Sequence, residues 1–364
     1  MSPKPNELLS NYISEQLQSA LRPIFIFEKL FFLSSYTLKD NFINVHTYVY
    51  YIISFTVVSL FICLQIYFNI YRVDIEIFYL LVANVCINCI AMIIILINII
   101  YYRKKYVNLI MRLQKIINAL PDSKKVLKSS LIWNWIQFSL LLLSVIAVIS
   151  AYIYTTRAYT NFSSSIYLFT TMYCDVGVYS GLQIIKLINS LINSWFQYFE
   201  SSDRNNVCNS MYATYLDILK AYATFTSVFR IPVRSQSNDF LKHYLNQVYY
   251  ALYSNISYLQ DMISFEIFFV VWMFKNMLNI VVFVKECEIM YQYILQIDKD
   301  CTYKLSRDLS LEESRVYKNL RRTNKATFRK MSMFGVTLDA GLPVQLAKLL
   351  ATYIIVLLQF ALSN

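Results

Sequence analysis

Long apolar stretches, separated by shorter polar ones, recur along the chain after residue 47. Each is close to the roughly 20 residues that a helix needs to cross the hydrocarbon core of a bilayer. An apolar helix suits this environment because its backbone hydrogen bonds are internal. The pattern therefore predicts an all-α, polytopic membrane protein. Five spans are clearly delimited, at about residues 48–70, 77–101, 131–154, 165–187 and 344–361.

The remaining apolar region, residues 247–297, fits either one span or two. A single span would be centred on Ile267–Trp272. Two spans, at about 250–273 and 277–297, would need a tight outer turn at Lys275-Asn276. They would also place several charged residues within or at the ends of membrane helices, which is costly.

The basic residues decide between these two readings. Segments 102–130 and 299–342 are both rich in Lys and Arg, as is typical of cytoplasmic segments. An even number of crossings must separate two inner segments, and the spans at 131–154 and 165–187 supply two. Region 247–297 is therefore expected to contribute two more. The prediction is seven transmembrane helices, with the N-terminus cytoplasmic and the C-terminus extracellular.

The inner segment 190–246 carries aromatic and aliphatic residues at helical spacing. We expect it to form helices that extend into the cytoplasm. The segment 299–342 has a helical pattern too, and the two are expected to pack together. The residues that carry the first pattern are Tyr212, Tyr215, Leu216, Leu219 and Tyr222.

Composition and charge agree with a membrane protein. Hydrophobic residues make up 57% of the chain and charged residues 15%, whereas a soluble domain is about a quarter charged. A net charge of +11 would suggest nucleic acid as the partner of a soluble protein. Here the basic residues lie between apolar spans, so we expect membrane lipid around the chain and no nucleic-acid partner.

The sequence offers no constellation for catalysis, a cofactor or a metal. His46 and His243 lie beside predicted inner segments, without clustered cysteines or acids. The pair Cys86-x-x-Cys89 has metal-like spacing, but it stands alone in a predicted span, so apolar filling is the better interpretation. No phosphate-binding glycine-rich loop is present. We expect neither enzymatic activity nor a cofactor.

Two glycosylation sequons occur in the chain. Asn161-Phe162-Ser163 falls in the short outer loop between the third and fourth spans. Asn255-Ile256-Ser257 falls in the predicted fifth span. Only Asn161 is therefore expected to be accessible for modification.

The strongest local motif lies in the last span, where Thr352-Tyr353, five apolar residues and Gln359-Phe360 follow one another. This pattern resembles the C-terminal signature of insect gustatory receptors. The family's lead-in to this helix is also similar to a stretch of this chain, Phe334-Gly335-Val336-Thr337-Leu338-Asp339. A looser similarity is found before the first span, at Leu21-Arg22-Pro23-Ile24-Phe25. The specific match covers the last span and its lead-in, and the rest of the chain agrees in topology and loop charge.

The resemblance implies a chemosensory receptor of taste neurons, located in the plasma membrane. Such a receptor is a ligand-gated, non-selective cation channel that detects a small-molecule tastant and assembles as a homo- or hetero-tetramer. It implies four regions along this chain. They are a cytoplasmic N-terminus at 1–47, a ligand-binding bundle at 48–298 with a cytoplasmic loop at 188–246, a cytoplasmic anchor at 299–342, and a pore-lining helix with an extracellular C-terminus at 343–364.

Helical spacing places Thr352, Val356 and Gln359 near one face of the last helix, with Tyr353 and Phe360 on its flanks. In a four-fold pore, Val356 would form a hydrophobic ring and Gln359 a polar ring just outside it. The alternative is that Gln359 makes an interhelical hydrogen bond and never meets an ion.

Asp175, in the middle of the fourth predicted span, is the candidate centre of a ligand pocket. An acid within a membrane span is a functional-site hypothesis by default. It would pair with a cationic tastant, helped by aromatic rings, or it would be a structural partner inside the bundle. The aromatic candidates for the same pocket are Tyr79, Tyr152, Tyr167, Tyr179 and Trp272.

Two other classes of membrane protein compete with the channel hypothesis. A G-protein-coupled receptor has its N-terminus outside, which the basic segments oppose. A secondary transporter usually shows internal repeats, broken helices and paired intramembrane charges. The sequence gives no sign of these, although Asp175 and Glu266 are the acids to follow.

Overall fold

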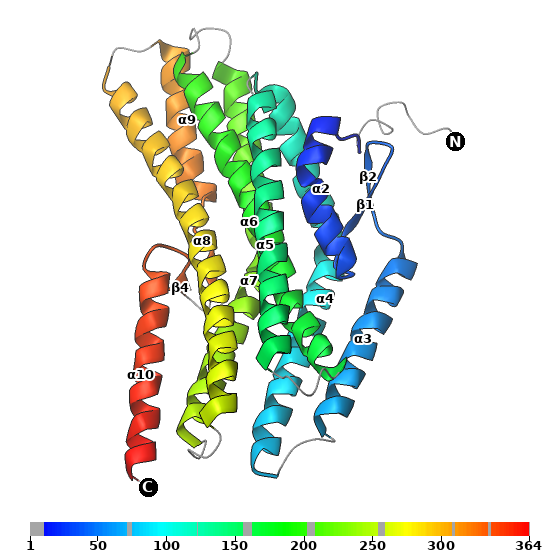
Figure 1. The fold of residues 1–364 in the computed structure, drawn as a ribbon. Coiled ribbons are helices and arrows are strands. Elements are labelled where there is room, and N and C mark those ends of the chain that lie inside the picture. Colours follow the sequence, from blue (N-terminus) through cyan, green and yellow to red (C-terminus); the bar gives the residue numbers. More distant parts are fainter. Residues whose placement is uncertain are drawn as a thin grey trace.

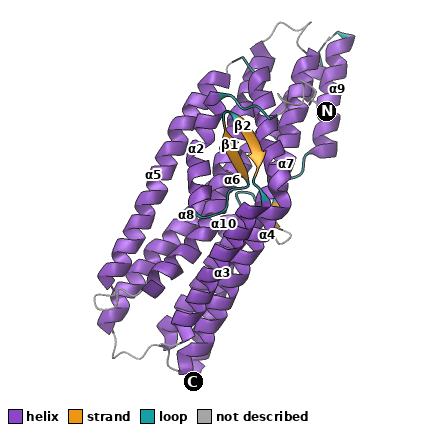
Figure 2. Ribbon diagram, turned by 90° about the vertical axis from the view of Figure 1, so that its right-hand side faces the viewer, coloured by secondary structure: helices purple, strands orange, loops and turns teal. Residues whose placement is uncertain are grey.

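The computed structural model describes residues 11–70, 75–121, 123–155, 162–201, 208–253, 259–307, 310–333 and 336–363, and the side chains of part of them. The predicted all-α class is confirmed, because these ranges are mostly helical (Figures 1 and 2). The helices are α2 (Glu15–Leu30), α3 (Tyr48–Ile70), α4 (Ile75–Ala119), α5 (Ser123–Thr155), α6 (Phe162–Ser201), α7 (Cys208–Tyr253), α8 (Leu259–Leu305), α9 (Leu311–Thr327) and α10 (Leu342–Ser363).

The long helices form an elongated bundle whose two ends differ (Figure 1). Helices α3, α5, α7 and α10 end at the lower end of the bundle, where α4, α6 and α8 begin. Helices α4, α6 and α8 run back to the upper end, where α2 and α9 lie. The described helix ends that flank the predicted outer segments after α3, α5 and α10 thus lie at one end, and the C-terminal end of the basic continuation of α4 lies at the other.

Helix α8 corrects the predicted boundaries of the fifth and sixth spans. It runs unbroken from Leu259 to Leu305, so the predicted turn at Lys275-Asn276 is wrong. No glycine or proline interrupts this stretch, and Asn276 is buried in the bundle. The two crossings predicted for this region would instead fall on the second half of α7 and the first half of α8. Asn255 falls between the ends of these helices, at Tyr253 and Leu259, and lies outside the described residues, as does Asn161.

The N-terminal region contributes a part of the core that the sequence analysis did not foresee. The Ser14 side chain accepts a hydrogen bond from the backbone N–H of Leu17 at 3.4 Å and so caps α2. One face of α2 is buried against α5 and α6, through Leu17, Ala20, Leu21, Ile24 and Phe27. A hairpin follows, in which β1 (Tyr36–Lys39) pairs with β2 (Phe42–Val45) across a turn with positive φ at Asp40 and Asn41.

The predicted packing between segments 190–246 and 299–342 is confirmed at the upper end of the bundle. Helix α9 begins with a capping box between Ser310 and Glu313 and lies against α7 and α8. The hydroxyl of Tyr215 on α7 donates to Oδ1 of Asn324 on α9 at 2.6 Å. A short hairpin of β3 (Ser332–Met333) and β4 (Val336–Thr337) then leads into α10.

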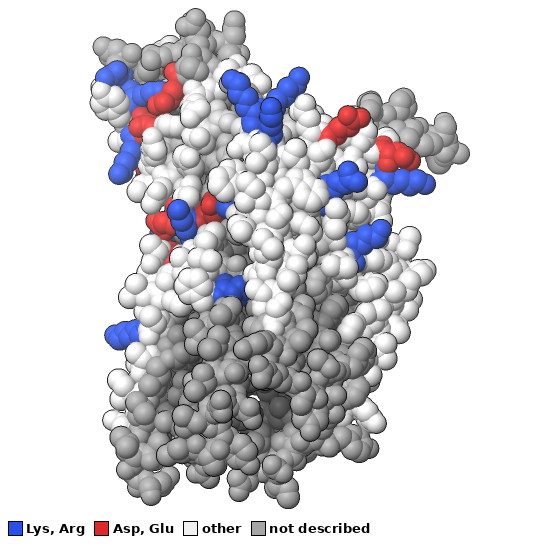
Figure 3. All heavy atoms as spheres, in the orientation of Figure 1, with Lys and Arg blue, Asp and Glu red and all other residues white. Residues whose placement is uncertain are grey.

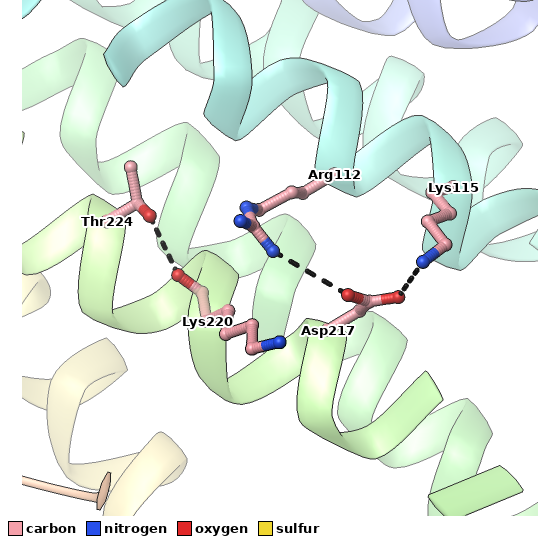
Figure 4. A network of polar contacts seen from close by, with 5 residues as sticks. All are labelled: Arg112, Lys115, Asp217, Lys220 and Thr224. Atoms are coloured by element: carbon pink, nitrogen blue, oxygen red, sulfur yellow. Dashed lines mark hydrogen bonds and ion pairs between the residues drawn. The ribbon is translucent and has the colours of Figure 1, made fainter. Parts of the chain in front are cut away.

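The basic segment after the second span is the continuation of α4, which ends at Ala119. Arg112 and Lys115 of this continuation approach Asp217 of α7 from two sides, at 3.6 and 2.7 Å (Figure 4). Beside them, the Thr224 hydroxyl donates a hydrogen bond to the Lys220 carbonyl at 2.8 Å. On the face drawn in Figure 3, the charged side chains of the described residues lie from the middle of the molecule to its upper end. These pairs join α4 to α7 outside the apolar part of the bundle.

Within the described residues, one helical stretch, Ser123–Ser144 of α5, is long and apolar enough to cross a membrane by length and composition. Only 11% of its most apolar 18-residue stretch is buried in the bundle. The exposed apolar side chains include Ile132, Trp133, Leu140 and Leu143. An apolar surface of this kind is favourable in lipid and unfavourable in water.

Candidate functional site

Helix α10 lies on the flank of the bundle, packed against α7 and α8 (Figure 1). Its start is fixed by Asp339, whose carboxylate accepts a hydrogen bond from the Thr337 hydroxyl at 2.6 Å and from the Gly341 N–H at 3.0 Å. These hydrogen bonds lower the pKa of Asp339. Leu342 is then buried, so the first turn of α10 is anchored to the bundle.

Beyond Leu346, every side chain of α10 that the structure describes is exposed. Thr352, Val356 and Gln359 are all exposed in the single chain, and so are Ala351 and Ile355, so the pore-facing role of the three stays a prediction. The Thr352 hydroxyl donates to the Lys348 carbonyl at 2.9 Å, within its own helix. The side chains of Tyr353 and Phe360 lie outside the described part of the chain.

Lys348 also belongs to the polar stripe of α10, and the sequence analysis passed over it. It is exposed and lies four residues before Thr352, so helical spacing puts it on the same face. The stripe therefore runs from Lys348 through Thr352 and Val356 to Gln359. The signal for Lys348 was its i, i+4 relation to Thr352.

Asp175 of α6 has a basic partner inside the bundle, Lys275 of α8. The two side chains form an ion pair and are 5% and 14% exposed, respectively. This arrangement matches the structural alternative for Asp175, while its contact with a ligand stays a prediction. It also shows a pair of opposite charges inside the bundle, which the sequence analysis did not find. Lys275 was missed because it had been placed in a turn.

Of the aromatic candidates for the ligand pocket, Tyr179 has a described side chain. Its hydroxyl donates to the Asn134 carbonyl of α5 at 3.1 Å, and its ring meets Phe27 of α2 edge to face. Tyr179 therefore packs where α2, α5 and α6 meet. The side chains of Tyr79, Tyr152, Tyr167 and Trp272 lie outside the described part of the chain.

A second buried polar cluster surrounds Glu28 of α2, and the sequence analysis missed it. Glu28 is 4% exposed, and its Oε1 accepts a hydrogen bond from the Tyr106 hydroxyl of α4 at 2.9 Å. Burial raises the pKa of Glu28 to about 7, against the opposing effect of the Ser180 and Tyr106 hydroxyls. The available signal was the position of Glu28 four residues after Ile24, on the buried face of α2.

Next to this cluster, Pro232 breaks the backbone hydrogen bonding of α7. Proline has no N–H, so the carbonyl of Val228 loses its donor within the helix. Asn98 of α4 replaces that donor, with its Nδ2 at 3.1 Å from the Val228 oxygen. Gly177 of α6 completes the junction, because a Cβ there would stand 2.7 Å from Cβ of Pro232. Helices α4, α6 and α7 therefore meet closely at this point.

Comparison with known proteins adds no relative. No family model matches the sequence, and no curated protein matches it.

Proposed function

We propose that the chain is a subunit of a ligand-gated, non-selective cation channel of the insect gustatory receptor type. It crosses the plasma membrane seven times, with α3 to α8 as a ligand-binding bundle and α10 as the pore helix. It detects a small-molecule tastant and works as a homo- or hetero-tetramer. The proposal rests on the C-terminal motif and on the placement of α10 outside the bundle.

The arrangement of helix ends supports the seven-span topology. Alternate helix ends gather at opposite ends of the bundle, as an alternating path across a bilayer requires (Figure 1). The basic continuation of α4 and the basic helix α9 lie at the end assigned to the cytoplasm. The upper parts of α6, α7, α8 and α9 then extend beyond the membrane and form the anchor region.

The observation that carries the proposal is the exposure of α10 in the single chain. A membrane helix that faced lipid alone would avoid an aligned polar stripe, because unsatisfied polar groups are costly in hydrocarbon. Lys348, Thr352 and Gln359 share one face with Val356. Around a four-fold axis this face lines a pore, with Val356 as a dewetting ring and Gln359 as a polar ring outside it. In the alternative, Gln359 would form a hydrogen bond to a neighbouring helix, either α7 or α8 of the same chain or a helix of another subunit.

Lys348 modifies the expected permeation properties. Four amines at the inner end of the stripe repel cations, and no acidic side chain lies on the described part of the same face. The channel is thus expected to have low conductance and weak selectivity. Replacing Lys348 with Gln is expected to increase inward cation current.

The test is voltage-clamp recording from cells that express the full chain, alone and with other family subunits, against a panel of alkaloids, sugars and fatty acids. Gln359→Ala and Gln359→Arg are expected to alter ion permeability, or to abolish the current, at unchanged surface expression. The matched control is Ala361→Ser, on the opposite side of α10 by helical spacing. An unaltered current–voltage relation in both Gln359 variants would refute the pore assignment.

The Asp175–Lys275 ion pair favours a secondary transporter as the second candidate function. Paired charges within the membrane commonly hold substrates or couple ions in such proteins. A transporter would give flux that saturates with substrate, and substitution of either partner would change its ion coupling. A channel would give currents that follow the electrochemical gradient, and substitution of the pair would change its surface level.

A further inference from the structure

A small cavity with mostly apolar walls and a few polar groups lies where α2, α4, α6 and α7 meet. Its volume is about 30 Å³, and its walls include both polar clusters described above. Apolar side chains such as Leu33, Ile95 and Val176 surround the polar groups. The cavity is separate from the α10 stripe and from the Asp175–Lys275 pair, none of whose residues line it.

Two buried oxygen atoms of residues that line the cavity accept no hydrogen bond of normal geometry from the described residues, although the Ser180 hydroxyl lies near enough to the Glu28 carboxyl to lower its pKa. They are Oε2 of Glu28, which is 4% exposed, and Oδ1 of Asn98, which is 3% exposed. The other oxygen of Glu28 is bonded by Tyr106, and the amide nitrogen of Asn98 is bonded to the Val228 carbonyl. One polar atom of each side chain is therefore fixed by a hydrogen bond, and the other oxygen is left without a donor of normal geometry. Buried acceptors without a donor are rare in folded proteins.

The size of the cavity limits what it can hold. A water molecule needs roughly 10–15 Å³ of such volume, so a space of about 30 Å³ takes one or two species of that size. An organic ligand or a large cation does not fit. A single water would satisfy an acceptor, but it would not balance the charge of Glu28 in its ionised form.

The chemistry of the wall then selects a small cation. Its polar groups are oxygens: a carboxylate, an amide carbonyl and the hydroxyls of Ser180 and Tyr106. Oxygen ligands are those that hard cations prefer. One carboxylate balances one positive charge, whereas a divalent ion normally gathers more acidic ligands. No basic side chain is among the residues that line the cavity.

We propose that this cavity is a sodium-binding site, in which Glu28 Oε2, Asn98 Oδ1 and the Ser180 hydroxyl hold one Na⁺ with at most one water. The ion ties α2 to the junction of α4, α6 and α7, at the point where Pro232 interrupts α7. Sodium therefore stabilises the bundle, whether or not the protein conducts ions.

The experiment is thermal unfolding of the purified full chain in lipid nanodiscs, in NaCl, KCl and choline chloride at equal ionic strength. Sodium is expected to raise Tm in a saturable way that potassium and choline do not reproduce. The Glu28→Gln variant should lose this response. The control variant Glu15→Gln, in the first turn of α2 and away from the cavity, should keep it.

A binding measurement with radioactive ²²Na⁺ completes the test. One ion per subunit is expected for the wild type and none for Glu28→Gln. If Glu28→Gln does not fold, Ser180→Ala, which removes one ligand and little volume, should weaken sodium binding several-fold. A cavity that holds water only would give equal Tm in the three salts and no bound ²²Na⁺, and that result would overturn the proposal.

Discussion

Replacement of Glu28 by Gln is expected to stabilise the protein, and to do so only at neutral and alkaline pH. Glutamine nearly preserves the shape of the side chain, and its carbonyl can accept the hydrogen bond from Tyr106. It removes the ionisable carboxyl, however. Because Glu28 is 4% exposed, that carboxyl is ionised at the expense of its hydration.

The magnitude follows from the pKa of Glu28. Burial raises it from 4.5 to about 7, so the folded chain keeps this proton at pH values where the unfolded chain has lost it. Stability is therefore fully present below pH 4.5, falls as the pH rises to about 7, and stays reduced above that. The total loss is about 3 kcal/mol, and it is discounted where sodium balances the charge.

The assay compares the Tm of wild type and Glu28→Gln in choline chloride at pH 5 and pH 8. The variant is expected to melt about 5 °C higher at pH 8 and at nearly the same temperature at pH 5. Glu15→Gln serves as the control and should show no pH-dependent difference. A variant that gains equally at both pH values, or that melts lower at pH 8, would refute the reasoning about burial of the carboxyl.

Three further outcomes are expected. Gly177→Ala should lower stability by about 1–3 kcal/mol in thermal unfolding, because the added Cβ would lie 2.7 Å from the Cβ of Pro232. A Tm equal to that of the wild type would show that α6 and α7 are not packed this closely. Lys275→Met should reduce the folded protein at the cell surface by removing the positive charge beside the buried Asp175, and the double variant with Asp175→Asn should recover it; failure of this rescue would argue against the pair. A tag after Asn364 should be accessible to antibody in unpermeabilised cells, and access only after permeabilisation would exclude the seven-span topology.

The helical class and the helical inner segments could be predicted because they depend on local pattern. Apolar length, basic residues and the spacing around Tyr215 are all readable along the chain. The position of a membrane crossing is harder to predict from the sequence. Counting charges gives an even number of crossings in region 247–297, but it does not say where the chain turns. The unbroken helix through Lys275 shows that its charge is accommodated by Asp175, which is 100 residues away in sequence.

The N-terminal region illustrates a second limit. Its 47 residues contain no long apolar stretch, so they suggested a tail before the first span. The buried face of α2 consists of residues spaced three and four apart, such as Leu17, Leu21 and Ile24, and its partners lie on α5 and α6. The cavity at Glu28 is formed where four helices pack together, and no local sequence motif predicts such a contact between distant segments.

The central claim is that the polar face of α10 meets its copies around a common axis. The most direct measurement is thiol cross-linking of Gln359→Cys in native membranes with short bifunctional methanethiosulfonates. Ala361→Cys, about 200° away around the helix, is the matched control, and the wild type reports cross-linking by its own cysteines. We expect covalent dimers for Gln359→Cys well above both controls. Monomeric Gln359→Cys at normal surface level, or stronger cross-linking of Ala361→Cys, would contradict the account.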